Sequence, residues 1–165
     1  MRKMKVFFIV LLSLWGCKEK PKEVVEEKTE IDFFDYRKMP KKHQVTSKVD
    51  SLIIPWKEFQ LFTSSLGVLY KATTAEDLAL AIDDVLEKEA ELYKSEYPEA
   101  FNKSQVKSRQ RVLRTYLLKV KADIANKMDA TPSVVEMLQA NNEFHEQFDI
   151  VLGNVLNSEL ILDDE

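Results

Sequence analysis

The chain has 165 residues, of which 45% are hydrophobic and 32% are charged, so it is long enough to form one domain with a substantial core. Its 24 basic and 28 acidic residues give a formal net charge of −4, and this excess of acid argues against general binding to nucleic acid. Only three glycines and five prolines are present, which favours helices over sheets.

The N-terminal residues have the pattern of a secretory signal. Three basic residues, Arg2, Lys3 and Lys5, precede an apolar run over residues 6–12. This run is about half as long as the roughly 20 residues that a bilayer-spanning helix needs. We therefore expect a signal peptide over residues 1–16 that is cleaved, rather than a retained membrane helix.

The end of this signal, Leu14-Trp15-Gly16-Cys17, resembles the lipobox of bacterial lipoproteins over four residues. Trp15 departs from the family pattern, which usually has Ala, Ser or Thr at that position. The resemblance implies cleavage before Cys17 and attachment of lipid to its sulfur, and two or more acyl chains hold a protein stably at a membrane. Because Cys17 is the only cysteine, no disulfide can form within one chain.

Residues 17–47 are expected to form the lipidated start of the mature chain and a flexible tether. Residues 18–30 are highly charged and of low complexity, which is typical of disordered segments. Three aromatic residues follow in the same tether, namely Phe33, Phe34 and Tyr36, and basic residues come directly after them. Two interpretations remain open: these aromatics pack onto the domain as an extended arm, or they dock onto a partner or onto the membrane surface.

Four amphipathic segments follow the tether, and each repeats apolar residues at helical spacing. The expected helices span about 48–71, 74–97, 103–128 and 132–157. They form an expected domain over 48–158, and an acidic tail over 159–165 comes after it. Because the connections are short, the predicted fold is all-α, an antiparallel four-helix bundle after a signal peptide and a flexible tether.

The starts of these helices carry recognisable signals. The expected N-terminal caps are Ser47 with Asp50, Thr74 with Asp77, and Asn102. Pro55 lies inside the first segment, so the first helix either kinks there or begins there with proline at its first position.

Charge is distributed unevenly over the four segments. The second is strongly acidic, the third is strongly basic, and the fourth carries only acidic charges. We interpret this pattern as internal: the basic helix lies between two acidic neighbours, and their ion pairs specify which helices are adjacent. In an alternative interpretation, one face of the basic helix stays open for an anionic ligand or an acidic partner.

Few residues suggest chemistry. The only histidines are His43 and His145, which excludes a zinc site built on several histidines or cysteines. His145 and Asp149 lie one helical turn apart and could bridge a metal, whereas Asn141 and Asn142 could fix the helix register or bind a small polar ligand. No nucleophile elbow or glycine-rich phosphate loop occurs. We therefore expect no enzyme activity and no cofactor, with His145 at the boundary of the core.

The sequence thus predicts a lipid-anchored protein of the bacterial cell envelope that is not catalytic and acts as a binding or assembly partner through its helical bundle. Its expected partners are the membrane, through lipid on Cys17, and another envelope protein. The alternative is a bundle that carries or senses a small ligand, haem or metal, and an envelope enzyme is less favoured. Lys18, rather than Asp, follows Cys17. By resemblance to the sorting rule of enteric bacteria, this implies the outer membrane, on its periplasmic or outer face, if the source is Gram-negative.

Overall fold

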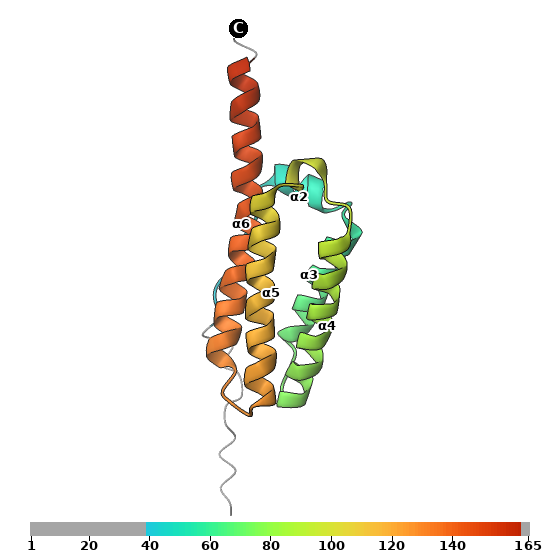
Figure 1. The fold of residues 1–165 in the computed structure, drawn as a ribbon, viewed down its shortest axis with the longest axis vertical. Coiled ribbons are helices and arrows are strands. Elements are labelled where there is room, and N and C mark those ends of the chain that lie inside the picture. The colour runs from blue at the N-terminus through green and yellow to red at the C-terminus, as the bar shows by residue number, and fades with distance from the viewer. Residues whose placement is uncertain (1–38, 163–165) are drawn as a thin grey trace, which may run out of the picture. The chain divides into compact units, whose positions relative to one another are not determined.

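The computed structural model describes the backbone of residues 39–162 and the side chains of residues 39–154. All regular structure in this range is helical. The elements are α2 (Ser47–Ile53), α3 (Lys57–Leu69), α4 (Ala75–Lys94), the short 3₁₀ helix η2 (Glu99–Phe101), α5 (Ser104–Ala125) and α6 (Thr131–Leu162) (Figure 1). The expected signal peptide, Cys17 and the aromatic residues of the tether lie outside the described residues.

Four of these helices form an antiparallel bundle, which confirms the predicted fold class. α3 packs against α4, α4 against α5, and α5 against α6, and each pair is joined by a short connection (Figure 1). Aromatic rings close the bundle between α3 and α6, because the ring of Phe59 contacts those of Phe144 and Phe148. Within residues 39–162, no helix has both the length and the hydrophobicity needed to cross a membrane.

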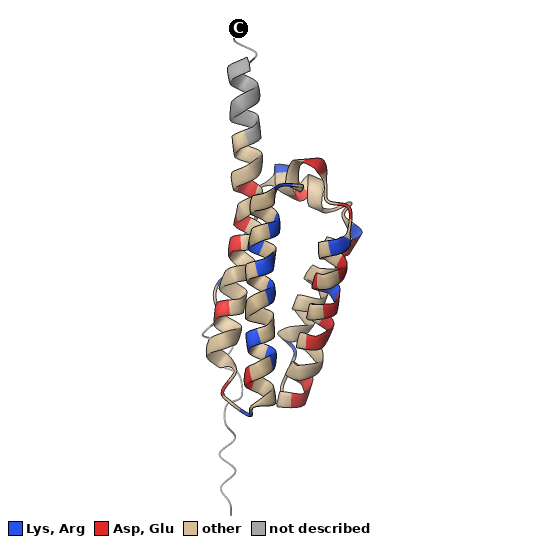
Figure 2. Ribbon diagram, viewed as in Figure 1, with Lys and Arg blue, Asp and Glu red and all other residues tan. Residues whose placement is uncertain are grey.

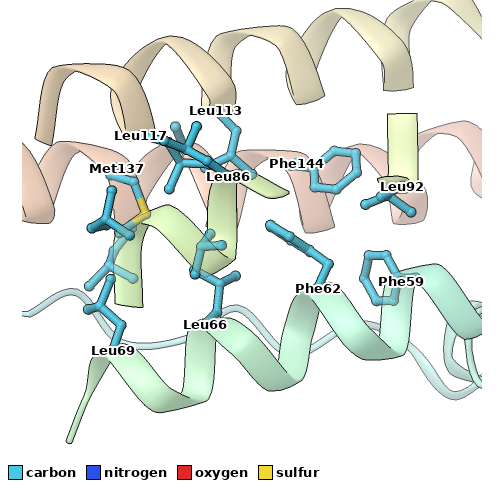
Figure 3. Close-up of a cluster of buried hydrophobic side chains, with 14 of the residues drawn as sticks. Phe59, Phe62, Leu66, Leu69, Leu86, Leu92, Leu113, Leu117, Met137 and Phe144 are labelled. Carbon is cyan, nitrogen blue, oxygen red and sulfur yellow. The ribbon is translucent and has the colours of Figure 1, made fainter. Parts of the chain in front are cut away.

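The core lies along the bundle axis and receives side chains from all four helices (Figure 3). Phe62 of α3, Leu113 and Leu117 of α5, and Met137 of α6 are among its fully buried side chains. Burial of one such side chain stabilises the fold by about 1.5–3 kcal/mol. The spacing of three or four residues between apolar positions is what turns each helix toward this axis.

The segment expected as one helix over about 48–71 consists of two helices. α2 ends at Ile53 and α3 begins at Lys57, so Pro55 lies in the link between them. Proline has no N–H to continue the helical hydrogen bonds. The break turns the buried Trp56 inward, where its indole N–H donates to Ser95 Oγ at 2.9 Å and its ring lies 4.7 Å from that of Tyr97.

The start of α4 confirms one predicted cap, because the N–H of Asp77 donates to Thr74 Oγ1 at 3.1 Å. The prediction for Ser47 was wrong. Ser47 is already the first helical residue of α2, and the residue before it, Thr46, makes no side-chain capping bond.

The predicted cap at Asn102 was also wrong, because α5 starts after Lys103, which makes no side-chain cap. The N–H of Asn102 instead donates to the carbonyl of Pro98 at 2.9 Å and closes η2. The end of α5 is better defined. Lys127 has a φ of 56°, and the N–H of the next residue reaches back to the carbonyl of Asp123 at 2.9 Å, which is the pattern of a Schellman cap.

Ion pairs join the basic α5 to both acidic neighbours (Figure 2). They are Lys121 with Asp83 and Arg114 with Glu89 toward α4, and Arg109 with Glu143 and Lys119 with Glu136 toward α6. These contacts confirm the prediction that the basic helix lies between two acidic ones. Three of the four pairs have both partners about half exposed, whereas Glu89 is buried.

Candidate functional site

Residues 39–46, which we call the strap, run to the start of α2 and are held against α6. Asn142 holds two backbone groups of the strap with one side chain. Its Nδ2 donates to the carbonyl of Lys41 at 2.8 Å, and its Oδ1 accepts from the N–H of His43 at 2.9 Å. The last part of the segment expected to be a flexible tether is therefore packed on the bundle.

Asp149 lies two helical turns after Asn142 on α6 and holds the strap at two further residues, His43 and Thr46. Its Oδ2 lies 3.0 Å from His43 Nε2, and its Oδ1 accepts from the N–H of Thr46 at 3.0 Å. Partial burial acts to raise the pKa of Asp149, but the hydrogen bonds from His43 and Thr46 outweigh it and hold that pKa below its usual value. Both carboxylate oxygens of Asp149 are thus engaged by the strap.

A small cavity, which we call the polar cavity, lies between the strap, α3 and α6. Its volume is about 50 Å³, and its wall includes Pro40, Lys42, Thr63, Tyr70, Asn141 and His145. Two buried oxygens in this wall, Thr63 Oγ1 and Asn141 Oδ1, have no hydrogen-bond partner among the described residues. An unsatisfied buried polar atom costs about 1–3 kcal/mol.

His145 is only 4% exposed and is held in one protonation state. Its Nδ1 lies 2.9 Å from the carbonyl oxygen of Asn141. Because a carbonyl only accepts, Nδ1 carries the proton and Nε2 does not. Burial lowers the pKa of His145 to about 4, so the ring is neutral near pH 7.

The size and polarity of the polar cavity limit what it can hold. A volume of this kind accommodates on the order of three water molecules or an equally small polar molecule, whereas pockets for haem-sized or drug-sized ligands are usually about 300–1,000 Å³. Of the predicted ligand residues, Asn141 and His145 line the cavity together. Asn142 also lines it, but its amide atoms hold the strap.

The structure places no further His, Cys, Asp or Glu side chain of residues 39–154 to complete a metal site with His145 and Asp149. Over residues 39–154, no group of three or more His, Cys, Asp or Glu side chains is placed to hold a metal ion. Cys17, Phe33, Phe34 and Tyr36 remain predictions, because they lie outside the described residues.

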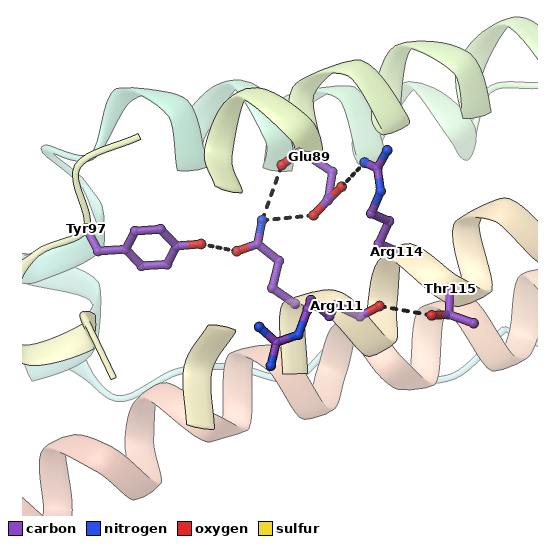
Figure 4. Close-up of polar contacts among 6 residues, drawn as sticks. Glu89, Tyr97, Arg111, Arg114 and Thr115 are labelled. Atoms are coloured by element: carbon purple, nitrogen blue, oxygen red, sulfur yellow. Dashed lines mark hydrogen bonds and ion pairs between the residues drawn. The ribbon is translucent and has the colours of Figure 1, made fainter. Parts of the chain in front are cut away.

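A second polar cluster is buried between α4 and α5, and its residues are not among the predicted site residues (Figure 4). Glu89 is 1% exposed, and its carboxylate pairs with Arg114 and accepts from Gln110 Nε2 at 3.0 Å. The hydroxyl of Tyr97 donates to Gln110 Oε1, and burial, aided by the charge of Glu89, keeps the pKa of Tyr97 well above its usual value. All members of this cluster are satisfied, so it joins α4 to α5 in one arrangement.

A sequence signal for this cluster exists. Ile82, Val85, Leu86 and Leu92 occupy the buried face of α4, and Glu89 falls at the helical position between them. A charged residue inside an apolar stripe indicates a buried, paired group.

Comparison of the chain with protein-family models, with curated proteins and with solved structures found no match.

Proposed function

We propose that this protein is a lipid-anchored component of the bacterial cell envelope, and that its helical bundle serves as a non-catalytic binding or assembly partner. The observation that carries the proposal is the sequence Leu14-Trp15-Gly16-Cys17 directly after a basic and then apolar N-terminal stretch. Lipid on Cys17 would place the bundle at a membrane surface, with the outer membrane favoured in a Gram-negative cell.

The organisation of the chain supports this proposal. Residues 18–38 separate Cys17 from the strap, and a fully extended chain of that length reaches at most about 75 Å. The bundle could therefore contact a partner at some distance from the lipid surface. Its interior is filled by apolar side chains, and the polar cavity is small, which favours recognition through the surface of the bundle over a ligand held inside it.

The anchor is tested by fractionation and intact-mass spectrometry of the full-length chain expressed in a bacterial host. We expect the wild type in the membrane fraction, lacking residues 1–16 and heavier by the mass of its acyl chains. Cys17→Ser removes the acceptor sulfur and should shift the protein out of the membrane fraction or leave it unprocessed. Lys18→Ala is the matched control, because it changes the next residue and keeps the thiol.

Two outcomes would contradict the proposal. An unmodified Cys17 thiol, or a mature chain that still begins at Met1, would remove the anchor. The partner role is tested separately by crosslinking and co-purification from detergent extracts, and a wild-type protein that reproducibly recovers no specific partner would remove that role.

A further inference from the structure

A groove of about 400 Å³ opens between α4 and α5, and we call it the α4–α5 groove. Its walls are formed by Glu89, Ala90, Tyr93, Lys94, Arg111 and Arg114. The groove lies beside the buried polar cluster, because Glu89 and Arg114 belong to both. Unlike the polar cavity, it is open to solvent and falls within the roughly 300–1,000 Å³ typical of ligand sites.

The charge in this groove is not balanced. Arg114 is neutralised by Glu89, but Arg111 and Lys94 make no ion pair within the part of the chain that the structure describes. The acid nearest to Lys94 in sequence on the same helix face, Glu91, lies 3.2 Å from Lys88 instead. Two cations therefore face this groove without an acidic partner among residues 39–154, in a chain whose net charge is −4.

An apolar and an aromatic side chain line the groove together with these cations. Tyr93 is 43% exposed, and Ala90 lies one turn before Lys94 on the same helix. Tyrosine and arginine are among the residues enriched at the positions that contribute most binding energy in protein interfaces. The planar guanidinium of Arg111 can donate two parallel hydrogen bonds to one carboxylate, and the positive charge of Lys94 would reinforce this binding.

We propose that the α4–α5 groove docks an acidic segment of a partner protein, with carboxylates bound by Arg111 and Lys94 and an apolar side chain packed on Tyr93. This inference rests on the proposed function and names the chemistry of the partner. A single phosphate or carboxylate would fill only a small part of the groove. An acidic peptide fits better, because it supplies several carboxylates together with apolar side chains.

The test measures binding of a fluorescent octapeptide of Glu, Asp and Leu to the full chain in non-ionic detergent by fluorescence anisotropy. Arg111→Glu and Lys94→Glu should each weaken binding at least about tenfold, and Arg111→Gln should weaken it less. Lys57→Glu is the matched control, because it makes the same change in net charge at the start of α3. A helix N-terminus tolerates an acidic residue, so this control should fold and bind within about twofold of the wild type.

Several results would overturn the inference. One is an Arg111→Glu protein, shown by thermal unfolding to be folded, that binds the peptide as tightly as Lys57→Glu does. Another is the absence of peptide binding. A third is binding of inorganic phosphate or of phosphatidylglycerol vesicles that is lost in Arg111→Glu and exceeds peptide binding, since this would assign the groove to phosphate groups.

The failure of this inference can be told apart from failure of the proposed function. If a partner that co-purifies with the wild type is retained by Arg111→Glu and Lys94→Glu, the partner role stands and the docking site lies elsewhere. If no partner co-purifies with the wild type, the proposed role fails whatever the peptide does.

Discussion

Burial affects the pKa of His145 more strongly than its hydrogen bond or the neighbouring charges do. Removal from water disfavours the charged imidazolium and lowers the pKa of His145 to about 4, and the nearby Lys42 and His43 act in the same direction. The hydrogen bond to the carbonyl of Asn141 and the charge of Asp149 act in the opposite direction and are outweighed. A histidine that stays neutral through the physiological range is a fixed structural donor, and it titrates only when the fold is lost or the pH is low.

Because folded His145 stays neutral, we expect the protein to lose stability in mild acid. In the unfolded chain an imidazole takes up its proton near pH 6.5, whereas folded His145 does so only near pH 4. The unfolded state therefore binds more protons between these values, and the stability present above about pH 6.5 falls as the pH is lowered toward 4. At about pH 4.5 the loss due to this residue should be about 2 kcal/mol, measured by urea unfolding.

His145→Gln serves as the comparison, because glutamine keeps an N–H donor and does not titrate. The difference in unfolding free energy between pH 7 and about pH 4.5 should be smaller in this variant by about the same 2 kcal/mol. An equal pH dependence in both proteins would show that His145 does not govern it.

At the scale of elements, the strap is a short segment that side chains of α6 hold in place. Asn142 and Asp149 supply the side-chain hydrogen bonds that join it to α6. Loss of Asn142 should free the strap around Lys42, because this one amide binds the backbone of both Lys41 and His43.

Asn142→Ala should therefore accelerate tryptic cleavage after Lys41 and Lys42 by several-fold, while thermal unfolding of the bundle changes little. The control is Glu143→Ala, which loses an ion pair with Arg109 that is about half exposed and leaves the strap bonds intact. Equal cleavage rates in the two variants would mean that Asn142 does not hold the strap.

At the scale of the whole molecule, helical spacing was enough to predict the bundle, and the distribution of charge predicted that the basic helix lies between two acidic ones. The predictions failed where contacts between distant residues determine the local structure. The residues around Pro55 could not show whether it kinks a helix or begins one. The helix breaks where Trp56 bonds to Ser95 and packs on Tyr97, and both partners lie far away in sequence. The strap was assigned to a tether because its partners on α6 lie about a hundred residues away in sequence.

Among the candidate site residues, the sequence predicted the polar residues of α6 but did not predict that Glu89 is buried. His145 and Asn141 were singled out as polar residues on an apolar helix, and they do line one cavity. Glu89 was counted among the charges of the second helix, since composition does not distinguish a solvated carboxylate from a buried one. Only its position within the apolar stripe carries that information.

The ion pairs of α5 should differ in how much each contributes to the free energy of unfolding, and this difference can be measured. Three pairs have both partners about half exposed, and pairs of that kind contribute about 0–1 kcal/mol each. At a middle value of about 0.5 kcal/mol for each pair, the combined variant Asp83→Asn, Glu136→Gln and Glu143→Gln should lose about 1.5 kcal/mol of unfolding free energy in urea. It also relieves part of the acidic excess, which works against any loss.

Arg114→Met alone should cost more, because it leaves the carboxylate of Glu89 buried without its counter-charge. Breaking a fully buried pair costs roughly 3–5 kcal/mol. We expect about 2–3 kcal/mol here, because the Arg114 side chain is 42% exposed and Gln110 still donates to Glu89. Adding Glu89→Gln to Arg114→Met removes the stranded charge and should recover part of the loss. A combined surface variant less stable than Arg114→Met would mean that the exposed pairs, rather than the buried cluster, hold α5 in place.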